Sequence, residues 1–479
     1  MKQLHSFYIN GSWNPAPADT ALDIINPATE TVVGSVAMGT AADAHSAIEA
    51  AVAAFPAFSK TTVTERIDLL ERVLACYKLR YDEFADAIRT EMGAPKTLAH
   101  EAQAYCGVEH LESTIAALKG FDLEVLRDGY KLRYEPIGIC GLITPWNWPI
   151  NQIVCKVAPA IAAGCTVVLK PSEYAALSAQ LFAEIMDKAG VPTGVFNMIF
   201  GDGAEVGAAI SSHPDINMMS FTGSTAAGVA VAVAAAPTVK RVSQELGGKS
   251  PIVIAEDVDL ETVIPECVWL CMENTGQSCN AGTRLIVPAH LHGRIVELAV
   301  AAAESYVVGD PTDAATQIGP LANARQYAKV TGLLRQAEAE GLTPATGGPE
   351  RPEGITGGYF VRPTIFAGLN NNQLVAREEV FGPVLAILPY ESVDEATKIA
   401  NETPYGLSAY VYTNDAKLAA TWSQDIRAGM VHINGAPLAA GAPFGGYKQS
   451  GNGREWGTYG LHEFLEVKAI MSNDQGGDT

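Results

Sequence analysis

The amino-acid sequence predicts a large α/β protein built on a doubly wound parallel sheet, followed by a second α/β domain and accompanied by a small strand arm. Short apolar runs alternate with helical segments from Gly138 onward, and a similar alternation begins again after Lys249. Strands that alternate with helices are typical of parallel sheets whose faces the helices cover. The chain has 479 residues, which exceeds the roughly 100–200 residues of a typical domain and predicts more than one.

The first alternation follows residues 41–118, which are expected to be mostly helical because apolar residues recur at helical spacing, for example within Thr64–Tyr81. Strands are then expected at residues 139–144, 166–170, 195–200 and 218–221, alternating with helices at residues 150–163, 178–189, 204–212 and 226–235. A sheet of this kind binds a nucleotide at the carboxyl ends of its strands. Residues 1–120 plus 136–247 are therefore interpreted as a dinucleotide-binding domain.

Residues 248–450 are interpreted as the second α/β domain. Its expected strands lie at residues 251–255, 284–287, 385–390 and 409–413, and its expected helices at residues 260–273 and 396–402. The Gly- and Pro-rich residues 344–363 are expected to form a loop within it. Residues 122–134 alternate apolar and polar side chains, and they are expected to pair with residues 464–471. The arm is accordingly assigned to residues 121–135 plus 463–474.

Composition and charge exclude several classes of partner. Hydrophobic residues make up 48% of the chain and the formal net charge is -21, so a well-buried protein that repels nucleic acid and anionic lipid is expected. The N-terminal residues contain no apolar signal segment, and no apolar run is a convincing membrane span, which predicts a cytoplasmic protein. The eight cysteines include no CxxC pair and the nine histidines no HExxH motif, so no metal site is expected.

Loop residues next to the predicted strands and helices are candidates for catalysis. Cys279 lies among small and polar residues in Gly276–Asn280, where a thiolate could attack a carbonyl carbon. Glu245 precedes a Gly-Gly turn and could act as a general base in an interdomain cleft. Asn147 follows a strand in the rigid sequence PWNWP and could donate a hydrogen bond to an oxyanion. Each has an ordinary alternative, respectively an inert cysteine, a turn glutamate and a turn-capping asparagine.

Two further segments have features of a dinucleotide site. Gly223–Gly228 follows a predicted strand and opens a helix, whose N-terminal amides could bind a pyrophosphate. This segment departs from the GxGxxG pattern and is a weak signal by itself. Lys170 and Glu173 end another strand of the same sheet, where they suit the two hydroxyls of an adenosine ribose or, alternatively, form a solvated strand end.

Taken together, the motifs resemble those of one family. The sequences PWNWP, KPSE, FTGST, ELGGKSP, GQSCNA, EEVFGP, YGLSAYV and PFGGYKQSGNGRE occur in the order and spacing of the aldehyde dehydrogenase superfamily. They run from Pro145 to Glu455, and the N-terminal FYINGSW also resembles the family's opening, so the resemblance covers nearly the whole chain. The resemblance to the non-acylating branch implies a Rossmann-like nucleotide domain, NAD(P)-dependent oxidation of an aldehyde to a carboxylic acid, and an arm used in oligomerisation.

The resemblance also implies a role for each matching residue. Cys279 would be the nucleophile, Glu245 the general base that activates water to hydrolyse the thioester, and Asn147 the oxyanion donor, while Lys156 and Glu455 would pass protons from the base. The implied coenzyme-binding residues are Thr144, Trp146, Lys170, Ser172, Glu173, Gly223, Ser224, Leu246, Glu379 and Phe381. The implied substrate-pocket residues are Trp148, Ser278, Leu438 and Phe444.

The resemblance leaves the substrate, the coenzyme and the assembly partly open. Trp148 stands where the family more often has phenylalanine, which predicts a partly aromatic pocket for an aromatic, aliphatic or semialdehyde substrate. Glu173 is expected to repel a 2′-phosphate, so NAD is favoured, with NADP possible, and a homodimer or homotetramer is expected. The alternative functions are a CoA-acylating relative, a cysteine hydrolase that needs no nicotinamide, and an inactive scaffold. Glu245, Lys170 and Glu173 argue against the CoA-acylating relative, and the presence of both Cys279 and Glu245 argues against the inactive scaffold.

Overall fold

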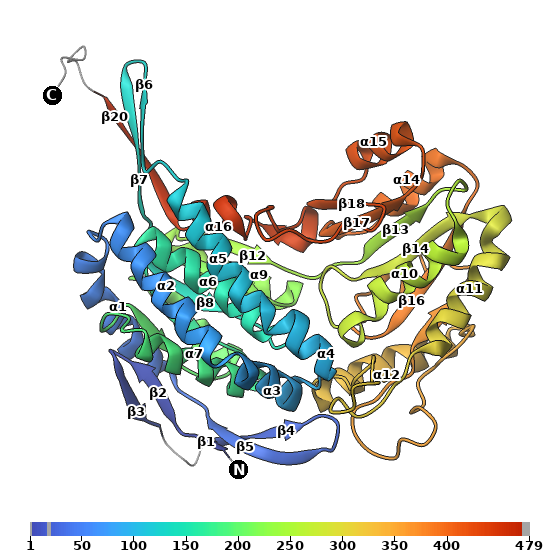
Figure 1. Ribbon diagram of the computed structural model, residues 1–479, viewed down its shortest axis with the longest axis horizontal. Helices are drawn as coiled ribbons and strands as arrows, with labels where there is room; N and C mark the ends of the chain where they lie inside the picture. The colour runs from blue at the N-terminus through green and yellow to red at the C-terminus, as the bar shows by residue number, and fades with distance from the viewer. Residues whose placement is uncertain (1, 17–20, 472–479) are drawn as a thin grey trace.

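The computed structural model describes residues 2–16 and 21–471, and within them the strands form two large sheets and two three-stranded sheets. Figure 1 shows the two large sheets in two lobes, with a narrow strand arm extending from the N-terminal lobe. Within the described residues, no helix combines the length and apolar character that are needed to cross a membrane.

The sheet of the N-terminal lobe has a parallel centre and antiparallel edges. Its strands lie in the order β19 (Gly451–Asn452), β12 (Arg241–Glu245), β11 (Met218–Thr222), β8 (Ile139–Ile143), β9 (Thr166–Lys170), β10 (Phe196–Met198), β2 (Ser6–Ile9) and β3 (Ser12–Pro15). The strands from β12 to β10 are parallel, whereas β19, β2 and β3 pair antiparallel with their neighbours. Buried apolar runs such as Ile139–Ile143 are typical of strands that are covered on both faces.

Helices cover both faces of this sheet. The chain passes from β8 to β10 in one direction along the sheet and then returns to β11 and β12 in the other. Because such crossovers are right-handed, α6 (Pro149–Ala163) and α7 (Ala176–Lys188) cover one face, whereas α8 (Ala208–Ser212) and α9 (Thr225–Ala235) cover the other. The direction reverses between β8 and β11, which is where a ligand crevice is expected. This is the doubly wound architecture that the sequence predicts.

Further helices of this lobe pack against the covering layers. The helices are α1 (Ala41–Phe58), α2 (Val63–Leu79), α3 (Tyr81–Met92), α4 (Lys96–Leu98) and α5 (Tyr105–Lys119). Helix α1 contacts α8, whereas α2 and α5 contact α6. Capping boxes define where α1 and α2 begin, since Thr40 and Thr62 each exchange hydrogen bonds with the acidic residue three positions later.

The sheet of the C-terminal lobe is parallel throughout. Its strands lie in the order β15 (Thr364–Phe366), β16 (Val384–Tyr390), β14 (Gly282–Pro288), β13 (Ser250–Ile254), β17 (Ser408–Tyr412) and β18 (Met430–Ile433). Its helices are α10 (Leu260–Met272), α11 (His292–Ser305), α12 (Ala324–Ala339), α13 (Leu374–Arg377), α14 (Val393–Asn401) and α15 (Ala416–Asp425). Ile252 and Ile254 join one apolar core and Val253 joins another, so that side chains alternate between two buried faces.

The arm is an antiparallel sheet of β6 (Glu124–Arg127), β7 (Tyr130–Pro136) and β20 (Leu465–Met471), the last of which follows α16 (Gly457–Glu463). Strand β7 lies in the middle, and Val467 of β20 is opposite its Tyr134. The pairing of these two segments, which are far apart in the chain, is the one that the sequence predicts. Residues 472–474 of the predicted arm lie outside the described residues.

Some elements differ from those expected. A sheet of β1 (Lys2–Leu4), β5 (Thr31–Ala37) and β4 (Ala21–Asn26) precedes the helices, and the sequence analysis did not anticipate it. The helix expected at residues 204–212 is a π-helical turn, Gly203–Gly207, followed by the short α8. The strand expected at residues 195–200 is limited to β10. Residues 344–363 contain no helix or strand element, as expected for a loop.

Candidate active site

The loop after β8 is fixed by buried hydrogen bonds around Asn147. The Asn147 side chain is 3% exposed, and its Nδ2 donates to the Gln277 carbonyl at 2.9 Å. Its own carbonyl accepts from Asn274 Nδ2 at 2.9 Å, and Asn274 Oδ1 in turn accepts from Gln103 Nε2 at 2.8 Å. The amide of Asn147 is therefore held directly against the segment that leads to Cys279.

That segment has a tight backbone. Asn274 and Thr275 both have a positive φ, 54° and 57°, between α10 and the loop of Cys279. Such a conformation is unfavourable for non-glycine residues and persists where surrounding contacts enforce it. Gln277 supplies such contacts, since its Nε2 donates to the Asn274 carbonyl at 3.0 Å and its Oε1 accepts from Ala322 N–H at 2.9 Å.

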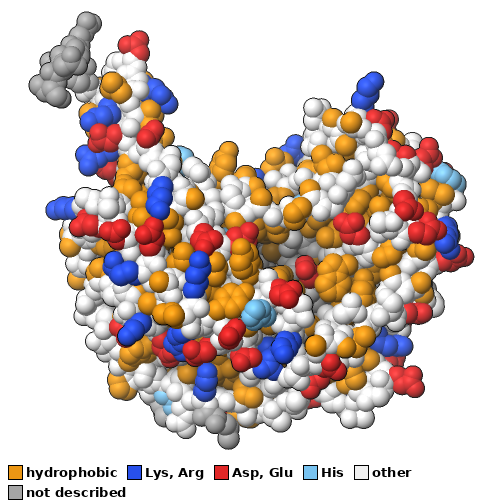
Figure 2. Space-filling view, viewed as in Figure 1, with side chains coloured by type: hydrophobic (Ala, Val, Ile, Leu, Met, Phe, Trp, Pro, Cys, Tyr) orange, Lys and Arg blue, Asp and Glu red, His pale blue; other side chains and the backbone are white. Residues whose placement is uncertain are grey.

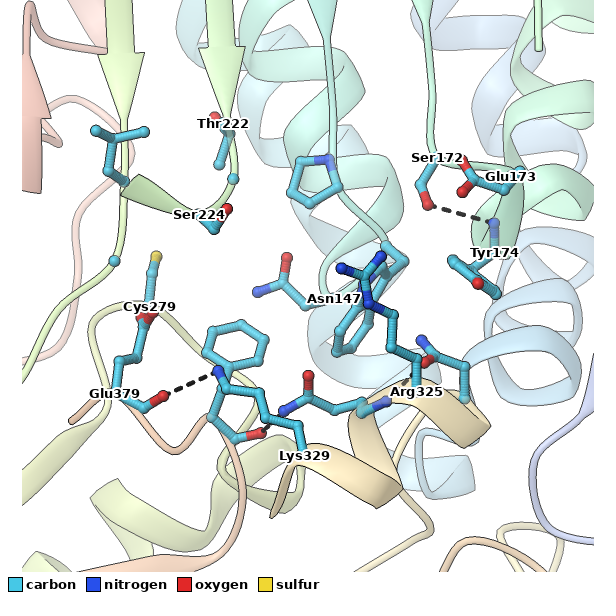
Figure 3. Close-up of a pocket in the computed structure, with 18 residues that line it drawn as sticks. Asn147, Ser172, Glu173, Tyr174, Thr222, Ser224, Cys279, Arg325, Lys329 and Glu379 are labelled. Carbon is cyan, nitrogen blue, oxygen red and sulfur yellow. Dashed lines mark hydrogen bonds between the residues drawn. The ribbon is translucent and has the colours of Figure 1, made fainter. Parts of the chain in front are cut away.

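Cys279 lies where two cavities meet. It is half-buried and lines both a cavity of about 580 Å³ and a second one of about 510 Å³. Figure 3 shows its sulfur on the opposite side of the first cavity from Ser172 and Tyr174. Figure 2 shows the molecule hollowed between its lobes, with hydrophobic side chains gathered in the hollow. Burial raises the pKa of the Cys279 thiol well above its usual range, and the nearby carboxyls of Glu379 and Glu245 raise it further.

The larger cavity lies at the reversal point of the first sheet. Eight of the residues that the sequence predicts for coenzyme binding line it: Trp146, Ser172, Glu173, Gly223, Ser224, Leu246, Glu379 and Phe381. Ser224 caps the N-terminus of α9, where its Oγ accepts from Ala227 N–H at 3.3 Å. Thr144 and Lys170 are buried behind this lining rather than part of it.

The polar residues of this cavity are held by specific partners. Lys170 Nζ lies 3.6 Å from Glu173 Oε2, so the two side chains form an ion pair at the end of β9. Glu379 Oε1 accepts from Gly248 N–H at 3.0 Å, and burial raises the pKa of its carboxyl. Phe381 has a φ of 60°, and its ring meets that of Trp146 edge-on at 5.7 Å.

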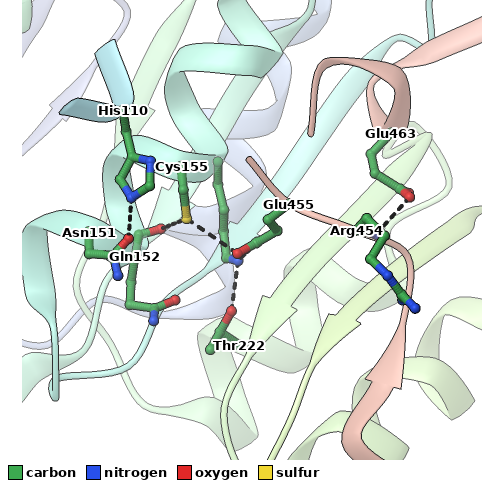
Figure 4. A network of polar contacts seen from close by, with 9 residues as sticks. His110, Asn151, Gln152, Cys155, Thr222, Arg454, Glu455 and Glu463 are labelled. Atoms are coloured by element: carbon green, nitrogen blue, oxygen red, sulfur yellow. Dashed lines mark hydrogen bonds and ion pairs between the residues drawn. The ribbon is translucent and has the colours of Figure 1, made fainter. Parts of the chain in front are cut away.

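Glu245 ends β12 in a buried polar network. It is 2% exposed, and neither carboxyl oxygen has a hydrogen-bond partner among the described residues. Burial raises the pKa of Glu245, and the charge of Glu455 raises it further, whereas Lys156 opposes the rise. Lys156 is fully buried, pairs with Glu455, and donates to Thr222 Oγ1 at 2.7 Å. Figure 4 shows Glu455 close to Thr222 and to Cys155, whose thiol donates to Glu455 Oε2 at 3.3 Å.

The second cavity is aromatic and acidic. The predicted substrate-pocket residues Trp148, Ser278, Leu438 and Phe444 all line it, and Trp148 Nε1 donates to Ser278 Oγ at 2.8 Å. Other aromatic or imidazole side chains in its lining are Tyr105, His110, Tyr410, His432 and Trp456. Glu101, Glu109 and Glu273 also line it, and the described lining residues include no lysine or arginine.

Some cavity residues come from segments that the sequence motifs do not mark. Tyr174 follows Glu173, and Asn323, Arg325, Gln326 and Lys329 lie at or just before the N-terminal turns of α12. Gln326 Nε2 donates to the Phe381 carbonyl at 2.7 Å, and Lys329 Nζ donates to the Glu379 carbonyl at 2.9 Å. The i, i+3 spacing of Gln326 and Lys329 on a helix is a signal that could have placed them on one face.

Comparison with known proteins decides the family. The model of the aldehyde dehydrogenase family matches residues 13–470. The chain belongs to the aldehyde dehydrogenase family. Oxidation of an aldehyde to a carboxylic acid is accordingly its reaction.

Relatives of this aldehyde dehydrogenase match over nearly their whole length. A 3-succinoylsemialdehyde-pyridine dehydrogenase from a Pseudomonas species is 50% identical over 98% of this chain and 99% of its own. The structure of a mutant of aldehyde dehydrogenase C from Pseudomonas syringae, in complex with NAD+ and octanal, is 46% identical with a TM-score of 0.97, covering 99% of this chain and 98% of that one. An aldehyde dehydrogenase from Mycobacterium tuberculosis, in complex with NAD+, is 37% identical with a TM-score of 0.97 over 100% of both chains.

Proposed function

We propose that this aldehyde dehydrogenase uses NAD to oxidise an uncharged aromatic or apolar aldehyde, through a thioester on Cys279. The observation that carries the proposal is the position of Cys279, whose side chain lines both cavities. One cavity has the features of a dinucleotide site and the other those of an apolar substrate pocket. A nucleophile at their junction can react with an aldehyde from one side while the hydride acceptor lies on the other.

The residues of the larger cavity fit NAD. The N-terminus of α9 offers amides to a diphosphate, and the Lys170–Glu173 pair offers a donor and an acceptor to the adenosine ribose. Thr144 Oγ1 is buried without a hydrogen-bond partner among the described residues, at the end of β8 beside this cavity. Glu379 and Phe381, nearest to Cys279 in the proposed arrangement, would hold the nicotinamide ribose and ring. Bound there, the coenzyme supplies the hydride acceptor.

Cys279 and Asn147 would carry the first half of the reaction. The Cys279 thiol gives up its proton to solvent, the sulfur adds to the aldehyde carbon, and the former carbonyl oxygen of the resulting thiohemiacetal becomes negatively charged. Asn147 Nδ2 and the backbone N–H of Cys279 would donate to that oxygen. Asn147 suits this role because buried hydrogen bonds hold its loop in place before substrate binds. Loss of hydride from the same carbon leaves a thioester on Cys279.

Glu245 would carry the second half. A base that removes a proton from water must itself be ionised and have a free oxygen, and both Glu245 oxygens lack partners among the described residues. Its raised pKa makes the carboxylate a stronger base than an ordinary glutamate. The proton would then reach the buried Lys156–Glu455 pair, which also bonds Thr222 and Cys155. Attack of the activated water on the thioester breaks the carbon–sulfur bond and releases the acid and the Cys279 thiolate.

The second cavity favours an aldehyde without negative charge. Its aromatic lining suits a ring or an alkyl chain, and its three glutamates with no lysine or arginine among the described lining residues disfavour a carboxylate. Burial raises the pKa of Glu273 and of Glu109, so these two side chains are weaker sources of negative charge than ordinary glutamates. The related 3-succinoylsemialdehyde-pyridine dehydrogenase, named for a pyridine-bearing aldehyde, supports an aromatic substrate.

We also propose a cytoplasmic homodimer or homotetramer. Apolar side chains are exposed on the arm, at Leu126 (80%) and Val467 (56%), and on α9, at Val229 (56%) and Val233 (68%). Exposed apolar patches of this kind are typical of surfaces that a second chain covers. The eight cysteines are all free, which supports a reducing compartment. The proposed division keeps residues 1–120 plus 136–247 for the coenzyme, 248–450 for catalysis, and 121–135 plus 463–474 for assembly.

The test is steady-state kinetics on an aldehyde panel with NAD, with Cys279→Ala as the inactive control. The panel contrasts benzaldehyde and octanal with succinic semialdehyde, which carries a carboxylate. We expect free acid as product without added CoA, and a kcat/KM for succinic semialdehyde at least about tenfold lower, since a desolvated carboxylate would lack a cationic partner. A requirement for CoA would overturn the hydrolytic mechanism, and a preference for the carboxylated aldehyde would overturn the substrate class.

A further inference from the structure

The charged side chains that line the coenzyme cavity differ in whether they already have a partner within the protein. Its lining includes the acidic Glu173 and Glu379 and the basic Arg325 and Lys329. Glu173 pairs with Lys170, Glu379 accepts from Gly248 N–H, and Lys329 donates to the Glu379 carbonyl. The guanidinium of Arg325 makes no hydrogen bond or ion pair with any residue of 2–16 or 21–471. Arg325 thus has all its donors available to a ligand, whereas one donor of Lys329 is already used.

Arg325 is nevertheless held over the cavity by the helix that carries it. Asn323 caps α12 by accepting from Gln326 N–H at 2.9 Å, and Gln326 anchors the same turn to the Phe381 carbonyl at 2.7 Å. Figure 3 shows the Arg325 side chain extending from this turn into the cavity, toward Asn147 and on the side of Tyr174. The cation also acts on Tyr174, because it opposes the rise that burial causes in the pKa of that phenol.

Arg325 belongs to the second lobe and faces the cavity residues that the first lobe contributes. Ser172, Glu173 and Ser224 come from strand ends and a helix start of the first lobe, whereas Arg325 belongs to the second. Glu173, Tyr174, Asn323 and Arg325 also line a neighbouring cavity of about 200 Å³, so Arg325 has space to change its side-chain conformation. A dinucleotide bound between the lobes would therefore lie within reach of a flexible guanidinium.

We infer that Arg325 binds a phosphate group of the coenzyme and helps to set coenzyme affinity. This inference rests on the proposed use of a nicotinamide dinucleotide. Guanidinium groups match phosphate oxygens with two parallel hydrogen bonds, and such charge-assisted bonds are about twice as strong as neutral ones. In a chain with a net charge of -21, an anionic coenzyme is repelled over most of the surface, so one available cation at its site has a large effect. The phosphate is either in the diphosphate bridge, which NAD and NADP share, or at the 2′ position of NADP.

The experiment measures dissociation constants of NADH and NADPH by fluorescence titration, and KM and kcat with NAD and NADP, for the wild type, Arg325→Ala and Arg325→Lys. Arg335→Ala is the matched control, because Arg335 is an exposed arginine of the same helix that lines none of the cavities described. We expect Arg325→Ala to weaken binding about tenfold or more with kcat little changed, and Arg325→Lys to recover part of the loss. The affinity of the wild type should also fall more steeply with salt than that of Arg325→Ala.

The two coenzymes distinguish the sources of the phosphate. Equal losses for NADH and NADPH would assign Arg325 to the diphosphate, whereas a loss confined to NADPH would assign it to the 2′-phosphate. Unchanged dissociation constants for both coenzymes, in a protein that binds NADH and oxidises aldehydes, would overturn this inference and leave the proposed function intact. Failure of the wild type to bind either coenzyme would instead overturn the proposed function.

Discussion

Replacement of Asn147 by alanine separates a catalytic role of this amide from a structural one. If Asn147 Nδ2 donates to the oxyanion, its removal is expected to lower kcat by about 10²–10³-fold, or about 3–4 kcal/mol in the barrier. The cost in stability should be much smaller. In the resting protein Nδ2 donates only to the Gln277 carbonyl, and that carbonyl also accepts from Asn274 Nδ2 at 3.3 Å. The carbonyl therefore stays paired, and the free energy of unfolding should fall by only about 1 kcal/mol.

Asn197 provides the matched control. It is fully buried in the nucleotide sheet, where its Nδ2 donates to Gly194 and Val167 carbonyls at 2.8 and 3.2 Å and its Oδ1 accepts from Asn10 N–H. Asn197→Ala should destabilise the protein by about 2–4 kcal/mol while kcat remains near that of the wild type. The assays are steady-state kinetics and chemical denaturation. The reasoning is refuted if Asn147→Ala keeps kcat within about fivefold of the wild type, or if its loss of activity only follows its loss of stability.

Three further predictions follow from the same contacts. Glu245→Gln should release about one NADH per site and then stop with the acyl group still bound to Cys279 as a thioester. In the wild type, thioester hydrolysis should slow as pH falls through the raised pKa of Glu245, because the protonated carboxyl no longer acts as a base. Rapid-quench mass spectrometry that finds no acyl-enzyme in the variant would contradict this role. Burial lowers the pKa of His110 to about 4. Below about pH 6.5 this histidine therefore binds a proton in the unfolded chain but not in the folded protein, and the free energy of unfolding falls as pH decreases from about 6.5 toward 4. His110→Gln, which keeps a partner for Asn151, should flatten that decline by up to about 3 kcal/mol in urea denaturation, whereas an unchanged pH slope would contradict the burial argument. Val467→Lys on the exposed face of the arm should reduce the assembly size in sedimentation velocity, and an unchanged oligomer would exclude this face from the interface.

The sequence predicts those parts of the fold that depend on local periodicity. The parallel strands β8, β9 and β11 are short, fully buried apolar runs, and such runs are visible without knowledge of their neighbours. Strand β12 has the sequence RVSQE, which has no apolar run, and its pairing with β11 decides its conformation. Helix α12 also escaped prediction, although its buried Gln326, Val330, Leu334 and Ala337 recur at helical spacing. Its first buried position is polar, which weakens the apolar stripe that identifies such helices.

The same distinction holds for the candidate site. Sequence motifs predict site residues that are adjacent in one loop, such as Trp146 with Asn147 and Ser278 with Cys279. The structure brings these two loops together through hydrogen bonds. The roles assigned to them stay predictions until the variants are measured. Arg325 and Lys329 enter the cavity only because the second lobe folds against the first, and no local pattern encodes that approach. The acidic side of the substrate cavity likewise joins Glu109 of α5 with Glu273, which follows α10.

Burial acts on both groups that the proposed mechanism ionises. It raises the pKa of the Cys279 thiol, so the thiolate is scarce in the resting protein, and it raises the pKa of Glu245, so that carboxylate is an unusually strong base when it is ionised. The charge of Glu245 is one cause of the raised pKa of the Cys279 thiol, so the site disfavours two negative charges at the same time. Lys156 opposes the rise in the pKa of Glu245, whereas Glu455, its ion-pair partner, adds to that rise. A thiol whose pKa is raised by burial must transfer its proton or gain a neighbouring positive charge before it can act as a nucleophile.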